Sequence, residues 1–190
     1  FVGLASFLSI YLRDQYDVSK VQAGDLASLW VLSGSFLRPV GGFLADKLGG
    51  IRMLTILFAA VALLAFALTQ MPSLAVTMVL LFLVMACLGV GNGSVFQLVP
   101  HRYGKQVGVA TGILGAAGGL GGFLLPTMLG TLKQITGSYA AGLMAFGGLS
   151  VAALVCLVIV QRKWIGDWIA EHGRVLPAAP VLPAEDAEPA

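Results

Sequence analysis

Apolar residues along the chain come in six blocks, at about 1–13, 21–45, 53–69, 74–99, 107–132 and 139–160. Short polar turns separate them: RDQYDVSK, DKLGGIR, QMPS, PHRYGKQ and KQITGS. The last five blocks have about the length of helix, roughly 20 residues, that crosses a hydrocarbon core. The apolar runs are continuous rather than alternating, which favours helices over barrel strands. The pattern predicts an all-α membrane protein with one partial and five complete spans.

The two ends of the chain differ from these spans. The first block, FVGLASFLSIYL, is too short to cross a bilayer and lacks the charged leader and cleavage site of a signal peptide. We interpret it as the end of a truncated helix, which makes the chain a fragment. The stretch KWIGDWIAEHGR places two Trp and two Ile on one face, predicting a short interfacial helix at 163–174 or an extension of the last span. The Pro- and Ala-rich residues 175–190 predict a disordered tail.

Composition and charge agree with a membrane protein. Hydrophobic residues make up 58% of the chain and charged ones 11%, with a mean hydropathy of +0.92. A net charge of +2, spread over short loops, argues against nucleic acid as a partner. One set of turns holds more basic residues than the other, which places that set and the C-terminus in the cytoplasm, as in a multi-pass protein of the plasma (inner) membrane. The first set is Lys47, Arg52, Arg102, Lys105, Arg162, Lys163 and Arg174, against Arg13, Lys20 and Lys133.

The residues of catalytic and metal chemistry are sparse. Cys87 and Cys156 lie inside apolar blocks, where a cysteine serves as a small hydrophobe. His101 and His172 fall in polar segments. An intramembrane enzyme needs clustered His, Asp, Glu or Ser within its spans. We therefore expect no enzyme activity, no metal site and no cofactor.

An arginine stands inside the second block. Arg38 lies eight residues before Asp46, about 12 Å along a helix, which is too deep for easy snorkelling. Asp25, thirteen residues earlier, is about 20 Å away and more than about 200° around the helix, so it cannot reach Arg38. Arg38 therefore either pairs with an acid outside this sequence or meets an anionic ligand. We favour the ligand, because the guanidinium fork suits nitrate, nitrite, a carboxylate or a phosphate.

The stretch GVATGILGAAGGLGGFLLP, 108–126, is dense in glycine. One stripe of a helix would hold its glycines at spacings of four and three, with Gly118 and Gly121 beside that stripe. Such a stripe predicts close helix packing, or bare backbone brought up to a substrate or a moving helix. The glycines of the stripe are Gly108, Gly112, Gly115, Gly119 and Gly122.

Two further residues stand near the end of the fourth block, in GVGNGSVFQLVP. Asn92 and Phe96 are four residues apart, so an amide and an aromatic ring can face one cavity. Each also has an ordinary explanation, an interhelical hydrogen bond for Asn92 and packing against lipid or core for Phe96.

The stretch GGFLADKLGGIR resembles the loop motif of major facilitator superfamily transporters. Asp46, Lys47, Gly49 and Arg52 match that motif, and Ile51 replaces one of its basic residues. The resemblance implies that Asp46 ties neighbouring cytoplasmic helix ends together, so these residues belong to the conformational machinery.

Other stretches resemble the nitrate/nitrite porter family within that superfamily. TGILGAAGGLGGFLLP is similar to its glycine-rich nitrate signature, SFLRPVGG to the helix with its second substrate arginine, and GNGSVFQL to the helix whose Phe packs on the anion. The resemblance implies that Arg38 binds the anion, Phe96 stacks near it, and Gly118 and Gly121 approach it by backbone. Asn92 belongs to the resembling stretch without a firm role.

The resemblance also implies twelve spans in two halves. This chain would be the C-terminal six-helix half, with an N-terminal half and the bilayer as its partners. Nitrate, nitrite or both would cross by alternating access, as nitrate/nitrite antiport or proton-coupled uptake. The lack of an intramembrane proton carrier in this half slightly favours exchange. The alternatives are a facilitator of organic anions, sugars or drugs, and a non-transporting fragment.

Overall fold

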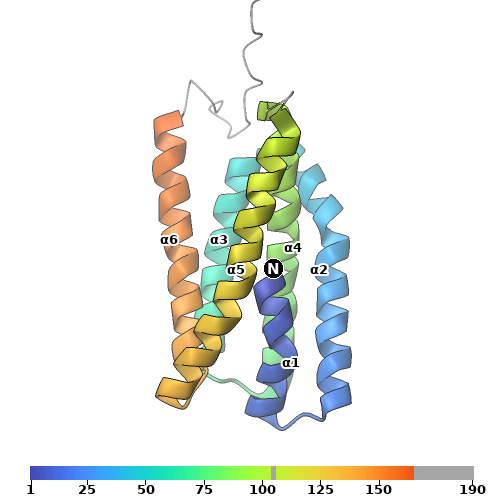
Figure 1. Cartoon of the computed structure of the whole chain (residues 1–190), viewed down its shortest axis with the longest axis vertical. Helices are drawn as coiled ribbons and strands as arrows, with labels where there is room; N and C mark the ends of the chain where they lie inside the picture. Colours follow the sequence, from blue (N-terminus) through green and yellow to red (C-terminus); the bar gives the residue numbers. More distant parts are fainter. Residues whose placement is uncertain (104–105, 165–190) are drawn as a thin grey trace, which may run out of the picture.

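The computed structural model of the chain describes residues 1–103 and 106–164. Six helices cover almost all of this part (Figure 1): α1 (Val2–Tyr16), α2 (Lys20–Leu48), α3 (Gly50–Leu68), α4 (Leu74–Tyr103), α5 (Val107–Thr136) and α6 (Ala140–Trp164). Each helix lies over one of the apolar blocks, and its ends differ from the predicted ends by at most four residues. The all-α architecture is confirmed. The predicted interfacial helix beyond Trp164 and the predicted tail lie outside the described residues.

Four of the helices, α3 to α6, are long and apolar enough to cross a membrane by length and composition. α1 has only 15 residues. α2 has 29 residues but carries charged side chains within its length, including Asp25 and Arg38. The complete span predicted at 21–45 is therefore a long helix whose polar content sets it apart from the other four.

The turns fall at two opposite ends of the bundle (Figure 1). At one end α2 passes into α3 through Gly49, whose φ of 88° is a conformation that glycine adopts without strain. At the other end Ser19 caps α2 by accepting a hydrogen bond from the Gln22 N–H, and α5 stops at Gly137 with a φ of 75°. Of the basic residues predicted to face the cytoplasm, Lys47, Arg52, Arg162 and Lys163 belong to helix ends on the Gly49 side.

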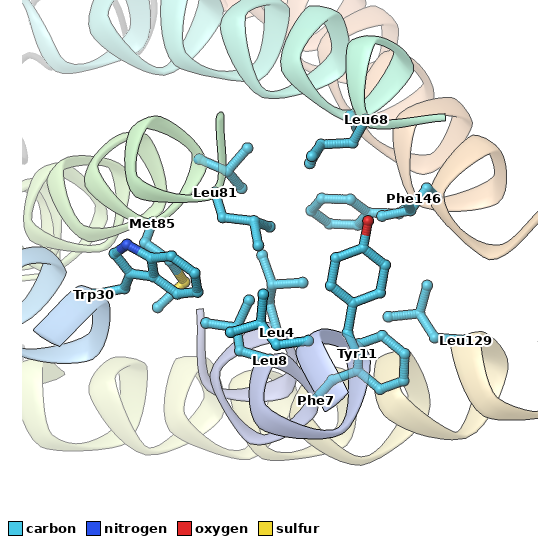
Figure 2. Packing of buried hydrophobic residues seen from close by; sticks show 14 of the residues in the cluster. Leu4, Phe7, Leu8, Tyr11, Trp30, Leu68, Leu81, Met85, Leu129 and Phe146 are labelled. Atoms are coloured by element: carbon cyan, nitrogen blue, oxygen red, sulfur yellow. The ribbon is translucent and has the colours of Figure 1, made fainter. Parts of the chain in front are cut away.

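The apolar core lies toward the Gly137 end. Figure 2 shows Tyr11 pointing from α1 toward Leu68 and Phe146, and Trp30 beside Met85. The core is built from α1, the first halves of α2, α4 and α6, and the second halves of α3 and α5. Its buried members are Leu4, Phe7, Leu8, Tyr11, Leu12, Ala23, Ala27, Trp30, Val61, Ala65, Leu68, Leu81, Val84, Met85, Leu129, Tyr139, Leu143 and Phe146.

Polar contacts tie the same end together. Lys133 Nζ on α5 lies 2.5 Å from Asp14 Oδ2 on α1, and the Tyr139 hydroxyl donates to the same oxygen at 2.8 Å. The hydrogen bonds from Lys133 and then Tyr139 lower the pKa of Asp14, because they stabilise its charged form. Nearby, the Tyr16 hydroxyl donates to the Pro72 carbonyl at 2.8 Å. α1 is thus joined by side chains to α5, to the residue before α6 and to the turn before α4.

α2 and α4 pack backbone against backbone. At three positions a Cβ added to a glycine would overlap a main-chain carbonyl of the facing helix, so any larger residue forces the helices apart. Ser94, which is fully buried, reinforces the contact with its hydroxyl 3.1 Å from the Gly41 carbonyl and 3.0 Å from that of Val90. The three overlaps are Gly89 on Gly34, Gly93 on Arg38 and Gly41 on Val90.

α5 is held mainly near its end. Leu129 is its buried residue. Gly3 of α1 packs against the middle of α5, since a Cβ on Gly3 would lie 3.1 Å from the carbonyls of Gly121 and Gly122. The earlier part of α5 leaves its glycine face open within the described chain.

Candidate functional site

Arg38 lies on α2 and is partly exposed. Its Nε is buried and has no hydrogen-bond partner among the described residues. No carboxylate of residues 1–103 or 106–164 forms an ion pair with it. The ring of Phe1 covers it instead, with the Arg38 Cζ 4.7 Å from the ring centroid. An arginine with a buried Nε and no acidic partner can bind an anion, because its charge and its hydrogen-bond donor are not compensated.

Two glycines make this arrangement possible. Gly34 lies one turn before Arg38 on α2, and a Cβ there would come within 2.5 Å of Phe1 Cε2, so the absence of a side chain gives the ring its seat. Gly93 of α4 packs on the Arg38 carbonyl. The main chain at Arg38 is therefore fixed on α4 while its side chain lies under Phe1.

A cavity of about 510 Å³ opens among α3, α4 and α5. Asn92 from α4 and Gly118 from α5 both line it, and so does Phe1. Leu57 and other apolar side chains make up much of the wall, so the Asn92 amide is a rare polar group there. The structure thus brings Asn92 and Gly118 to one cavity, and Phe1 joins that cavity to Arg38.

The other two predicted substrate contacts lie elsewhere. Phe96 follows Asn92 by one turn but is 43% exposed and does not line the cavity. Gly121 contacts Gly3 of α1 through its carbonyl, so within this chain it serves helix packing.

The residues of the loop motif, at the turn between α2 and α3, connect the end of α2 to α4. Asp46 accepts hydrogen bonds from Gln97 Nε2 of α4 at 2.8 and 2.9 Å. Lys47 Nζ lies 4.4 Å from the centroid of the Phe43 ring, while Gly49 makes the turn. Arg52 is exposed at the start of α3. The sequence indicated Asp46 but contained no signal for Gln97.

Among the described residues the glycine stripe of α5 has open space beside most of its members, so its packing role stays a prediction. A Cβ added to Gly112, Gly115 or Gly119 would meet nothing within 4 Å, and one on Gly122 would meet only ordinary contacts, the nearest at 3.6 Å from Val2. The close backbone packing lies between α2 and α4 instead. The sequence reasoning missed Phe1, Gly34, Gly41 and Ser94, although Gly34 and Gly41 are both small residues on one long helix. In the described part of the chain no group of three His, Cys, Asp or Glu is placed to hold a metal.

The described residues thus form a six-helix apolar bundle in which Nε of Arg38 is buried without a partner and the loop motif joins α2 to α4. The family model described as Major Facilitator Superfamily matches residues 1–178, and the chain belongs to this superfamily. It is a multi-pass membrane protein.

Within the superfamily, the chain is similar to proteins named for nitrate or nitrite transport. The chain is 37% identical over 158 residues to the nitrite extrusion protein of Bacillus subtilis, covering 83% of this chain and 40% of the relative. It is 32% identical to a probable nitrate transporter NarT of Staphylococcus epidermidis, covering 86% and 42%, and 35% identical to the NarT of Staphylococcus carnosus, covering 83% and 40%. The chain thus spans about two fifths of the length of these relatives. No solved structure matches it.

Proposed function

We propose that the chain is the C-terminal six-helix half of a transporter that moves nitrate, nitrite or both across the membrane by alternating access. The names of the similar proteins, a nitrite extrusion protein and nitrate transporters, support this cargo. The partner would be an N-terminal half of the same transporter, and the chemistry would be transport without an enzymatic step.

The observation that carries the proposal is the state of Arg38. Its Nε is buried without a partner in the described part of the chain, and its Cζ lies 4.7 Å from the centroid of the Phe1 ring. The donors of a guanidinium lie in its plane and stay charged at any working pH. A small planar oxyanion lying in that plane would accept hydrogen bonds from these donors. The donors would in turn replace the water molecules that the anion loses when it binds.

The remaining contacts would surround the same anion. Asn92 would offer an amide and Gly118 bare backbone from the shared cavity. Phe96 would stack near the anion, and Gly121 would approach it by backbone once the second half of the transporter closes the site. The open glycine face of α5 supports this, since it leaves room for a second helix bundle.

Alternating access would rock the two halves around this site. The motif contact between Asp46 and Gln97 would keep the ends of α2 and α4 together during the movement. A proton carrier would have to be an acid within the membrane helices. The candidate in α2, Asp25, is exposed near the start of that helix and far from Arg38. This favours nitrate/nitrite exchange over proton symport for this half. The Gly49 end and the C-terminus would face the cytoplasm, with the protein in the plasma (inner) membrane.

The test is Arg38→Lys in the full-length transporter, measured as nitrate and nitrite uptake into proteoliposomes. Lysine keeps the charge but loses the fork, so we expect uptake to fall about 10- to 100-fold, as the loss of a charge-assisted hydrogen bond predicts. Arg162→Lys near the end of α6 is the matched control and should transport normally.

Unchanged kinetics in Arg38→Lys would reject a substrate role for Arg38. Transport of an organic anion, sugar or drug, with neither nitrate nor nitrite moved, would reject the proposed cargo. No transport of any solute by correctly folded protein would identify a non-transporting chain.

A further inference from the structure

Phe1 takes part in two features that the proposed function treats separately. Its ring lies over the Arg38 guanidinium, and the same residue lines the cavity that Asn92 and Gly118 share. Nothing in the sequence pattern distinguishes it from the other phenylalanines of the apolar blocks.

We propose that Phe1 is a positioning residue for anion binding: its ring holds the Arg38 guanidinium in the orientation that presents the paired in-plane donors to the anion. This inference rests on the proposed function. A distance of 4.7 Å from Cζ to the ring centroid lies inside the range, about 6 Å, in which a cation is attracted to an aromatic face. No described residue accepts a hydrogen bond from Nε of this guanidinium, so that donor stays available to an anion.

The surroundings fix the ring and leave the side chain of Arg38 as the movable part. The ring occupies the space beside Gly34, where a Cβ would lie 2.5 Å from Phe1 Cε2 and 3.1 Å from Cζ. The main chain of Arg38 is pinned because Gly93 packs directly on its carbonyl. An arginine side chain has several rotatable bonds, and ordering them is a cost of binding that a preformed contact removes.

A purely apolar packing role for Phe1 predicts different behaviour from an electrostatic one. Adding fluorines to the ring keeps its shape nearly constant and withdraws the negative charge from its face. A cation held by that face responds to each fluorine, whereas a packing contact does not.

The experiment replaces Phe1 in the full-length transporter with 4-fluoro-, 3,5-difluoro- and 3,4,5-trifluorophenylalanine and measures KM and kcat for nitrate and nitrite in proteoliposomes. We expect KM to rise stepwise, to about three- to tenfold for the trifluoro ring, with kcat changed less than about twofold. Phe1→Leu should raise KM at least as much, and Phe1→Trp should keep it near the unsubstituted value. The same series at Phe36, which is 78% exposed on α2, is the matched control and should leave KM unchanged.

The outcomes separate the two proposals. A flat series at Phe1 with normal transport rejects the positioning role and leaves the proposed function standing. Equal effects at Phe1 and Phe36 reject it as well, since the response would then not depend on Arg38. Failure of the unsubstituted transporter to move nitrate or nitrite rejects the proposed function, and the inference falls with it.

Discussion

The backbone contact between α2 and α4 makes a sharp prediction at Gly93. A Cβ added there would lie 2.8 Å from the Arg38 carbonyl carbon and 3.0 Å from its Cα, whereas ordinary contact begins at 3.4 Å. The obstructing atoms are main chain, so no rotamer change relieves the overlap. The Arg38 carbonyl oxygen would be overlapped even more than these two atoms, so in Gly93→Ala the two helices must separate, which shifts the main chain of Arg38.

The matched control stands two residues earlier. A Cβ on Gly91 would meet only Leu57 Cδ1, at 3.6 Å, an ordinary contact. Both substitutions gain the same helix propensity, so the difference between their melting temperatures isolates the overlap. Forcing extra volume into a packed interface costs about 1–3 kcal/mol. A cost of that size lowers a melting temperature by about 2–4 °C per kcal/mol in a chain of this size.

Thermal unfolding followed by tryptophan fluorescence in detergent, together with nitrate uptake, provides the assay. Gly93→Ala should melt several degrees below Gly91→Ala and should transport with a raised KM, because the backbone of Arg38 is displaced. Equal melting temperatures and unaltered KM in the two variants would refute the backbone contact.

Two other substitutions test other parts of the bundle. Asp14→Asn should destabilise the protein at neutral pH by about 0.2–1 kcal/mol, the range for exposed ion pairs, seen as a lower melting temperature. Because Lys133 and Tyr139 lower the pKa of Asp14, this contribution is present above the usual Asp pKa and is lost as pH falls below about 4. The difference in melting temperature between the two proteins should therefore close in acid. A difference that does not change with pH would contradict the ion pair. The side chain added in Gly119→Leu meets open space within this chain, so the melting temperature of the isolated chain should change little. Nitrate uptake by the full-length transporter should fall, because the leucine would clash with the other half. Normal uptake would exclude packing at that face.

The helices were predictable because their signals are local. Continuous apolar runs and the charges between them locate each helix, and the observed helices run on for a few residues into the polar turns, as at the end of α1, where Asp14 still belongs to the helix. Asp14 is held in that position by Lys133 of α5.

Contacts between helices were harder to predict. Glycine content shows which face is small but not which helix approaches it. The dense glycines of α5 therefore drew the packing prediction, while the closest approach lies at Gly89 and Gly93 against α2. The site shows the same limit: the unpaired charge of Arg38 is visible in the sequence, but Phe1 is one apolar residue among many.

The interlocking of α2 and α4 also bears on which anions fit. Many binding sites adapt to larger ligands by letting their walls spread. Here Arg38 and the helix that carries Asn92 are joined through main-chain atoms, so neither can yield without separating the whole pair. In the proposed transporter a site fixed in this way would select by size: a larger oxyanion would be excluded because the distance between Arg38 and Asn92 would be set by the backbone rather than by side chains.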